Sequence, residues 1–323
     1  MRGLKRLGIF IASLVIAGSA VTALRADDYP SKPVRLVVGF IPGSAADITA
    51  RVLGMRMGQI LGQQFVVESK PGAGSSLAAD FSAHAPADGY TLFLGSSANI
   101  TNTAINPKLI DISKNLAPIA LATTAPVILV VHPSTGVNTL QELIAFAKAK
   151  PGEVLYASTG VGTAPHLAAE LFAMRAGIKL VHVPYQGSPQ AVIDLLAART
   201  TMMFSPASAV IAQVEAGKLK ALASAAAKRP AVAPNIPTMA EAGMPDFDTS
   251  IWFGLMAPLG TPREVIDKLT RALREAQQSS EVLTTLRTQG FDVIIGGPDD
   301  LARMMQSETK RWSEVATAAG LKK

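Results

Sequence analysis

The amino-acid sequence predicts an α/β protein made of two closely joined domains. Short apolar, β-branched runs alternate with amphipathic helical patterns along most of the chain. Strands and helices that alternate at these lengths indicate parallel sheets covered by helices on both faces. The chain has 323 residues, 49% of them hydrophobic, which is enough for two domains with substantial cores. No long linker separates two halves, so the domains are expected to be interleaved or tightly connected.

Residues 1–26 are predicted to be a secretory signal peptide. Arg2, Lys5 and Arg6 precede an apolar run from Leu7 to Leu24, and the segment contains no acidic residue. A transmembrane anchor is the alternative, but glycine and hydroxyl residues make this run less apolar than most membrane spans. The chain has no cysteine and so forms no disulfide, which suits a protein of the bacterial periplasm that folds around an ordinary core.

The basic character of the whole chain comes largely from the predicted leader. The chain has a net charge of +6 at pH 7, and the leader carries four basic residues and no acidic ones. Without it, 26 basic residues face 24 acidic residues, which leaves a net charge of +2. The basic residues are scattered, and four tyrosines and two tryptophans offer few rings for stacking on bases. Nucleic acid is therefore not expected as a partner.

The elements follow in order from the two kinds of pattern. Strands are predicted where short β-branched runs end near turn residues, at 34–40, 65–69, 91–95, 127–132, 154–158, 180–184, 201–205, 219–224, 251–258 and 291–295. Helices are predicted where apolar residues recur every three or four positions, at 46–61, 76–85, 140–148, 164–176, 189–198, 208–216, 262–278 and 299–319. Ligands of such sheets bind beyond the carboxyl ends of the strands, at loops that lead into helices.

The turn FIPGSAAD at residues 40–47 joins the first strand to the first helix and is the first candidate binding loop. A helix N-terminus presents unpaired backbone N–H groups and the positive end of the helix dipole, so it can hold an anion without a basic side chain. The one charged residue, Asp47, is expected in the first helical turn, aimed away from the ligand. The candidate ligand-binding residues of this loop are Phe40, Pro42, Gly43, Ser44, Ala45 and Asp47.

A second strand, glycine-rich turn and helix follow at residues 154–172. If each of the two loops lies at the end of its own domain's sheet, they can face each other across a cleft. The stretch GVGTAP is not a dinucleotide fingerprint, because Pro165 stands where the third glycine should be. The candidate ligand-binding residues here are Ser158, Thr159, Gly162, Thr163 and His166.

Three further loops at predicted strand ends, residues 94–102, 183–190 and 204–208, are rich in hydroxyl and amide groups. Any one of these side chains would more commonly complete a turn or a helix cap, but their recurrence at strand ends favours a binding site. The candidates are Ser96, Ser97, Asn99, Tyr185, Gly187, Ser188, Phe204 and Ser205.

The sequence contains no recognisable catalytic constellation. It has no G-x-S-x-G elbow, no P-loop, no H-E-x-x-H motif and no cysteine. Its histidines, His84, His132, His166 and His182, do not occur at metal-binding spacing. The sequence therefore predicts neither catalytic residues nor a metal site, although an exported α/β enzyme such as an esterase remains the alternative.

The chain contains, in order, YPSKPVRLVVGFIPGSAADITAR, ESKPGAGSSLAAD, APADGYTLFLGSSANITNTAINPKL, ASTGVGTAPHLAAELF, VPYQGSPQAVIDLLA and AKRPAVAPNIPTMAEAGMPDFDTSIWFGLMAPLGTPREVIDKL. These stretches resemble successive signatures of the Bug family, the extracytoplasmic solute receptors of tripartite tricarboxylate transporters. The resemblance runs through essentially the whole chain after the predicted leader.

The resemblance implies a two-lobed periplasmic binding protein of the type II-like, Venus-flytrap kind, with two crossover strands. In the family, the loop that corresponds to Pro42–Asp47 and the strand-end loops of the other lobe grip a carboxylate. Ser44 and Ser75 stand where the family usually has glycine, and Thr201 and Ser205 stand where many members have aspartates. Ser75 joins the candidate ligand-binding residues, and these departures leave the ligand's identity open.

Lobe 1 is expected to combine residues 27–124 with 256–323, and lobe 2 to comprise residues 125–255. The crossings are placed near Thr124 and Leu255. The protein is expected to be a monomer without a cofactor that works in the periplasm with the membrane subunits of a tripartite tricarboxylate-type transporter. The alternative partner is a membrane sensor kinase to which the receptor presents its ligand.

The ligand is predicted to be a small carboxylate without an amino group. A desolvated ammonium needs a carboxylate or several carbonyl acceptors nearby, and the candidate loops contain one acidic residue, Asp47. An apolar or aromatic body of the ligand is expected against Phe40, Tyr185, Phe204 or Trp252.

Overall fold

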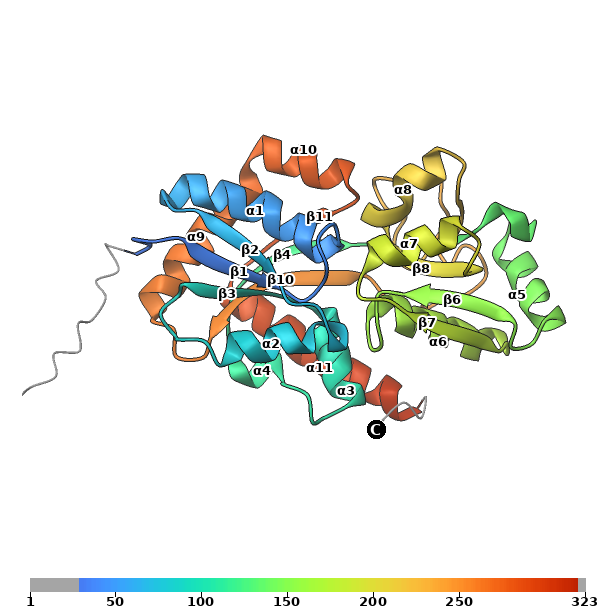
Figure 1. Cartoon of the computed structure of the whole chain (residues 1–323), viewed down its shortest axis with the longest axis horizontal. Helices are drawn as coiled ribbons and strands as arrows, with labels where there is room; N and C mark the ends of the chain where they lie inside the picture. Colours follow the sequence, from blue (N-terminus) through green and yellow to red (C-terminus); the bar gives the residue numbers. More distant parts are fainter. Residues whose placement is uncertain (1–28, 319–323) are drawn as a thin grey trace, which may run out of the picture.

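The computed structural model describes residues 29–318, which form two α/β lobes side by side (Figure 1). The predicted signal peptide lies outside the described residues. Lobe 1 contains the strands β1 (Val34–Val38), β2 (Phe65–Ser69), β3 (Thr91–Ser96), β4 (Leu116–Ala125), β10 (Ile251–Pro258) and β11 (Asp292–Gly296). Its helices are α1 (Ala45–Leu61), α2 (Ser76–Ala83), α3 (Ser97–Ile105), α4 (Ile112–Asn115), α9 (Arg263–Gln278), α10 (Ser280–Thr288) and α11 (Pro298–Ala318).

Lobe 2 is formed by the middle of the chain. Its strands are β5 (Val127–Val131), β6 (Val154–Ser158), β7 (Leu180–Pro184), β8 (Met202–Pro206) and β9 (Lys220–Ser224). Its helices are α5 (Leu140–Ala149), α6 (Ala164–Ala176), α7 (Ser188–Leu196) and α8 (Ala207–Glu215). The two-lobed α/β fold predicted from the sequence is confirmed.

Each lobe is built on one sheet, and both sheets are mixed. The strand order is β11-β4-β10-β3-β1-β2 in lobe 1 and β7-β6-β8-β5-β9 in lobe 2. Strand β1 runs parallel to β2 and β3, and β6 runs parallel to β7 and β8. Strand β10 is antiparallel to β3 and β4, and β5 is antiparallel to β8 and β9. The expectation of parallel sheets was therefore wrong for the strands that connect the lobes, because these are not joined through the helical crossover that parallel pairing requires.

The chain passes between the lobes at two places. Strand β4 ends at Ala125 in the first sheet and β5 begins at Val127 in the second, so Pro126 alone separates them. The return leads into β10, which pairs with β4 along its whole length and with β3 from Phe253 to Met256. The expected division between residues 255 and 256 therefore falls inside a strand of lobe 1, and we place the boundary just before Ile251. Figure 1 shows β4 running toward the second lobe and β10, which is antiparallel to it, leading back from that lobe.

Two elements near the cleft were not predicted. Strand β4 has the sequence LAPIALATTA, whose Pro118 and many alanines hide the strand, and a register shift at Leu255/Met256 accommodates the proline. Helix α3 has the polar sequence SANITNTAI and was expected to be a loop. It forms a helix because Ser96 and Asn99 make a capping box at its start, while Ile100 and Ile105 are buried.

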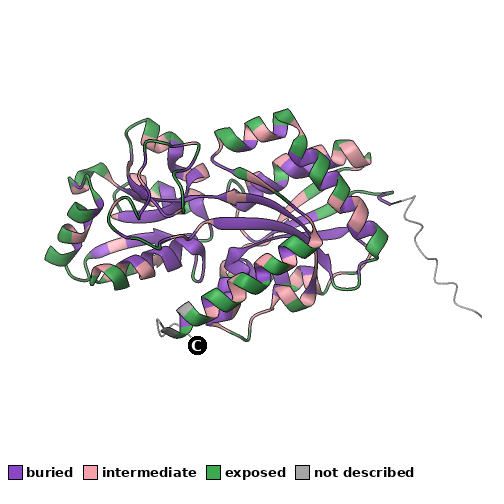
Figure 2. Cartoon of the chain, turned by 180° about the vertical axis from the view of Figure 1, so that it is seen from behind, coloured by how far each residue is buried: buried purple, intermediate pink, exposed green. Residues whose placement is uncertain are grey.

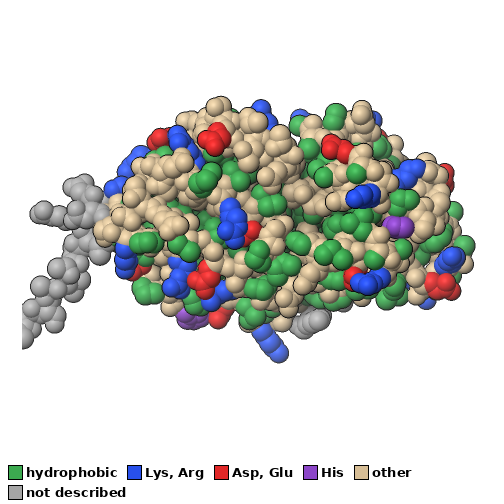
Figure 3. Space-filling model, turned by 45° about the horizontal axis from the view of Figure 1, so that its top comes forward, with side chains coloured by type: hydrophobic (Ala, Val, Ile, Leu, Met, Phe, Trp, Pro, Cys, Tyr) green, Lys and Arg blue, Asp and Glu red, His purple; other side chains and the backbone are tan. Residues whose placement is uncertain are grey.

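The sheets form the buried centre of each lobe, and the helices expose their outer faces (Figure 2). On the face seen in Figure 3, acidic and basic side chains are interspersed over both lobes. Within residues 29–318, none of the helices combines the length and the apolarity that a bilayer span requires.

Candidate functional site

A small pocket with an empty volume of about 360 Å³ lies between the lobes. Neither acidic nor basic side chains line it. The lining residues are Phe40, Ser44, Ala45, Ala46, Ser96, Ser97, Ala98, Ile251 and Phe253 of lobe 1, and Thr159, Thr163, Ala164, Pro165, Gly187, Ser188 and Pro206 of lobe 2.

Five helix N-termini converge on this pocket. Each of the strands β1, β3, β6, β7 and β8 is followed by a helix whose N-cap or first residues line it. The N-caps are Ser44 for α1, Ser96 for α3, Thr163 for α6, Gly187 for α7 and Pro206 for α8. The first amides of a helix have no acceptor within the helix, and the dipole makes this end positive. The helix ends thus bring partial positive charge to the pocket, although no cationic side chain of the described residues lines it.

The first of these N-termini is held by Asp47. Its Oδ2 accepts hydrogen bonds from the backbone N of Gly43 (2.9 Å) and from Nε of Arg51 (2.9 Å). The Ser44 Oγ accepts a bond from the backbone N of Asp47 (3.4 Å), which leaves the hydroxyl proton of Ser44 free to donate. The hydrogen bond to Asp47 also raises the pKa of Arg51. Asp47 is buried and does not line the pocket, so it shapes the loop.

The N-terminus of α3 contains a buried hydroxyl without a partner among the described residues, on a residue that lines the pocket. The Ser97 side chain is buried, with 3% of the residue exposed, and its Oγ has no hydrogen-bond partner within the described part of the chain. The side-chain amide of the neighbouring Asn99 is already hydrogen-bonded. Its Oδ1 accepts from the backbone N of Ser96 (3.1 Å) and its Nδ2 donates to the carbonyl of Ser75 (3.3 Å). Asn99 therefore holds the loop in shape, and Ser97 is the side chain left for a ligand.

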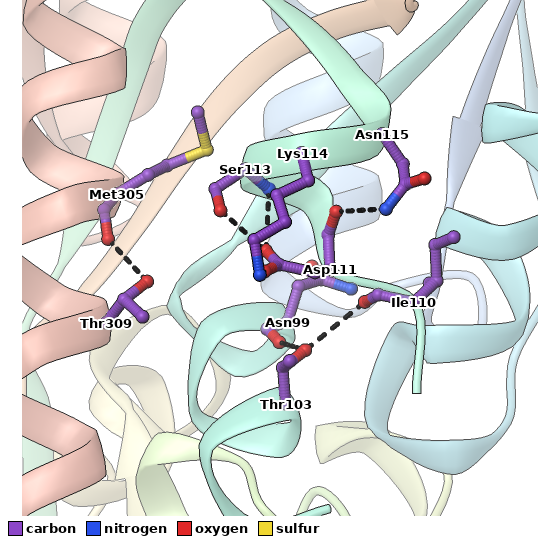
Figure 4. A network of polar contacts seen from close by, with 9 residues as sticks. All are labelled: Asn99, Thr103, Ile110, Asp111, Ser113, Lys114, Asn115, Met305 and Thr309. Atoms are coloured by element: carbon purple, nitrogen blue, oxygen red, sulfur yellow. Dashed lines mark hydrogen bonds and ion pairs between the residues drawn. The ribbon is translucent and has the colours of Figure 1, made fainter. Parts of the chain in front are cut away.

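Helix α3 is tied to the segment that follows it. Figure 4 shows the Thr103 Oγ1 donating to the carbonyl oxygens of Asn99 (2.9 Å) and Ile110 (3.2 Å). In the same network Asp111 accepts hydrogen bonds from the backbone N and the hydroxyl of Ser113, and pairs with Lys114. The bond from Thr103 to Ile110 thus fixes α3 against the segment that follows it, and the Asp111 contacts order that segment.

The loop before α6 uses its hydroxyl protons internally. Thr159 Oγ1 donates to Thr163 Oγ1 (3.1 Å), which in turn donates to the carbonyl of Gly160 (2.7 Å). Ser158 lies behind the loop, where its Oγ is 2.6 Å from Nε2 of His182. A ligand anion would therefore be met in this loop by the first amides of α6 rather than by either threonine proton.

Two histidines support that loop from behind and do not line the pocket. His166 Nδ1 accepts from the backbone N of Gly162 (3.2 Å), and its ring stacks on His182 at a centroid distance of 4.3 Å. The His182 ring also stacks on Tyr156 at 4.8 Å. Burial is the main cause that lowers the pKa of His182 from 6.5 to about 4, and the neighbouring His166 is the second cause. At neutral pH His182 therefore adds no charge to the site.

The apolar wall of the pocket comes from β10 and from Phe40. Side chains alternate along a strand, so Ile251 and Phe253 face the pocket while Trp252 is buried in the core of lobe 1. Phe204 does not reach the pocket either, because it packs between Phe172 and Phe247 at centroid distances of 5.9 and 5.8 Å. The expectation that an apolar ligand body rests on Trp252 or Phe204 therefore does not agree with the structure.

The lobes touch each other directly around the pocket. The hydroxyl of Thr101 on α3 donates to the carbonyl of Gly162 in lobe 2. A Cβ at Gly162 would overlap Oδ1 of Asn102 in lobe 1, and a Cβ at Gly187 would lie 2.8 Å from Cγ1 of Ile41. The structure thus represents a closed arrangement in which these two glycines permit close approach of the lobes.

The sequence-predicted site residues divide into three groups. Those that line the pocket are Phe40, Ser44, Ala45, Ser96, Ser97, Thr159, Thr163, Gly187 and Ser188. Tyr185 lines a neighbouring cavity, and Pro42 and Gly43 lie exposed at the start of α1. Those that shape the loops or the core without lining the pocket are Asp47, Ser75, Asn99, Ser158, Gly162, His166, Phe204 and Ser205. In this last group, Ser75 has a φ of +82°, which explains why glycine suits its position.

Sequence reasoning missed seven lining residues: Ala46, Ala98, Ala164, Pro165, Pro206, Ile251 and Phe253. Most of them are the small residues that begin helices, where the backbone rather than the side chain contributes. The predicted start of each helix could have identified these residues as lining residues. For Ile251 and Phe253, the alternation of side chains along the strand shows that both lie on one face of the sheet. It does not show whether that face borders the cleft.

Comparison with known proteins shows that the chain is similar to transporter receptors over most of its length. Residues 49–321 match the family described as tripartite tricarboxylate transporter family receptor. The protein BugT of Bordetella pertussis is 37% identical over 319 residues, which cover 98% of this chain and 97% of BugT. The structure of R. palustris Rpa4515 with adipate is similar with a TM-score of 0.88 at 33% identity, over 91% of this chain and 99% of that one. MatC from Rhodopseudomonas palustris with bound malate has a TM-score of 0.85 at 32% identity, over 89% and 99%.

These relatives are solute-binding receptors and not enzymes, which confirms the prediction of a binding protein. Within residues 29–318, no group of three or more His, Asp or Glu side chains could hold a metal ion. The match extends over most of the chain and agrees with the fold, the interlobe pocket and the resemblance noted in the sequence. The chain therefore belongs to the receptor family of the tripartite tricarboxylate transporters.

Proposed function

We propose that this protein captures a small carboxylate without an ammonium group in the interlobe pocket. The observation that carries the proposal is the convergence of five helix N-termini on a pocket that no charged side chain lines. Each N-terminus is equivalent to roughly half a positive charge, so a carboxylate is favoured there without a guanidinium. Ser97 lines the same pocket, and its hydroxyl, which has no partner within the described part of the chain, would add a donor there.

The same pocket disfavours an amino-acid ligand. An ammonium removed from water needs acceptors, and the one acidic residue of the loop, Asp47, is engaged by Gly43 and Arg51. The Ser205 Oγ donates to the carbonyl of Pro206 and does not line the pocket. The positive helix ends would also repel an ammonium. The similar structures that carry adipate and malate support the proposal, since both ligands are carboxylates without amino groups.

The proposed setting is the periplasm, where the receptor would deliver its ligand to the membrane subunits of a tripartite tricarboxylate-type transporter. The predicted signal peptide and the family support this setting. We expect the receptor to act as a monomer. Delivery to a membrane sensor kinase is the alternative role, and genes for a large and a small membrane subunit beside the receptor gene would favour transport.

Thermal shift followed by calorimetry would test the ligand class. The panel contains succinate, malate, adipate and benzoate, with aspartate and glutamate as matched acids that carry an ammonium. A ligand at 100 times its Kd stabilises the folded state by about 2.7 kcal/mol, which a melting curve resolves. We expect one or more of the plain acids to bind and the amino acids to bind at least tenfold more weakly. Tight binding of the amino acids alone would overturn the proposal.

A further inference from the structure

A second cavity adjoins the carboxylate pocket and has an empty volume of about 560 Å³. The two cavities share Phe40 and Thr159, so they lie next to each other and those two residues form their common border. We call this second cavity the outer chamber. Lobe 1 contributes the end of β1 and the turn at residues 72–74, and lobe 2 contributes residues 159–161 and 184–186.

The outer chamber is open because backbone rather than side chains forms much of its wall. Gly39, Gly72, Gly74 and Gly160 all line it. Gly72, Gly74 and Gly160 have positive φ angles of 138°, 58° and 128°, which disfavour any residue with a Cβ. A Cβ at Gly39, Gly72 or Gly74 would overlap Ser75, Leu77 or Asn102, none of which lines the chamber, so these glycines allow close packing behind its wall.

The side chains that line the outer chamber carry no charge. The Tyr185 hydroxyl donates to Oδ2 of Asp194 (2.7 Å), which occupies the polar end of that side chain. Burial and this hydrogen bond raise the pKa of Tyr185 to about 12, so the ring is neutral at physiological pH. Phe40 and Val161 add apolar surface, and Val161 is 44% exposed, so the outer end of the chamber reaches solvent.

We propose that the outer chamber receives the apolar body of a ligand whose carboxylate lies in the inner pocket. The inference rests on the proposed function and narrows it to extended carboxylic acids, whose apolar part is longer than that of malate. Such an acid would place its head among the helix N-termini and pass its chain or ring along Phe40 toward Tyr185. Any second carboxylate at the far end would lie near solvent, where it remains hydrated.

Affinity measured against chain length tests this inference. The probes are the straight-chain diacids succinate, adipate and suberate and the monoacids butyrate, hexanoate and octanoate, measured by calorimetry. Burial of each added methylene is expected to raise the affinity about fourfold until the chain reaches solvent. A wild-type affinity that falls steadily from the four-carbon acids to the longer ones would overturn the inference.

Filling the chamber provides the second arm of the test. In Val161→Trp the large ring should remove most of the gain from chain extension, so that long and short acids bind with similar affinity. Val181→Trp is the matched control, because Val181 is 39% exposed on β7 in the same lobe and does not line the chamber. The control should keep the wild-type dependence on chain length. A melting curve shows whether each variant is folded, and Tyr185→Ala, which enlarges the chamber, should shift the preference toward bulkier acids.

The outcomes separate this inference from the proposed function. If short acids bind but extension brings no gain, or if Val161→Trp weakens short and long acids equally, the chamber inference fails and the carboxylate proposal stands. If no acid of any length binds, both fail.

Discussion

Replacement of Ser97 by alanine should stabilise the ligand-free protein and weaken binding at the same time. The Ser97 Oγ is buried at the N-terminus of α3, lines the pocket, and has no partner within residues 29–318. An unsatisfied buried hydroxyl costs about 1–3 kcal/mol, and alanine at this position removes that cost. We therefore expect the free energy of unfolding of the ligand-free Ser97→Ala protein to rise by about 1 kcal/mol.

The loss in binding follows from the same hydroxyl. A hydrogen bond to a charged group contributes about 1.5–3 kcal/mol, and 1.4 kcal/mol corresponds to a tenfold change in affinity. Ser97→Ala should therefore weaken binding of the tightest acid of the calorimetric panel by about 10- to 100-fold. Urea denaturation of the ligand-free protein gives the first quantity, and calorimetry gives the second.

Ser82→Ala is the matched control for this experiment. Ser82 is a fully buried serine on α2 whose Oγ also has no partner within the described part of the chain, and it does not line the pocket. Its replacement should raise stability by a similar amount and leave the affinity unchanged. Wild-type affinity in Ser97→Ala, or a loss of stability without ligand, would show that the hydroxyl does not face the ligand.

Two further predictions concern closure and pH. Gly162→Ala should keep the lobes apart, because its Cβ would overlap Oδ1 of Asn102, whereas Gly177→Ala imposes the same positive φ with no neighbour within 4 Å. Scattering at saturating ligand should show a larger radius of gyration for the first variant, and equal radii would contradict the closed contact. The pKa of His182 is lowered from 6.5 to about 4 in the folded protein, so between these two pH values the unfolded chain binds more protons than the folded one. His182 therefore reduces the free energy of unfolding as the pH falls from 6.5 to 4. Urea denaturation at pH 7 and pH 5 should show a smaller loss for His182→Gln, and an equal loss would refute the assignment.

The fold and the main binding loops could be predicted because their signals are local. Alternation of strands and helices indicated an α/β fold, and the glycine-rich turns after β1 and β6 marked two loops that line the pocket. The lack of cations in those loops already indicated recognition by helix N-termini. These conclusions depend on properties of short segments, which a sequence displays directly.

Other features depended on partners that are distant in the chain. The polar segment of α3 gives no helical pattern, and it becomes a helix through its capping box and through Ile100, which is buried beneath it. Strand β4 has an interrupted pattern and is formed by its long pairing with β10. The burial of Ile100 and the pairing of β4 with β10 are tertiary contacts, so the local sequence could not reveal them, whereas the capping box of α3 is local but has Asn99 where Glu or Gln is usual.

The sequence by itself determined which loops end the strands and that those loops carry almost no charge. The tertiary structure decided which face of each element lines the pocket. It turned Ile251 and Phe253 toward the pocket and buried Trp252 and Phe204, although all four are large apolar residues of predicted strands. It also brought Gly162 of lobe 2 against α3 of lobe 1. The physical reason is that alternation along a strand gives two faces without saying which is the inner one, and only the packing of two lobes assigns them.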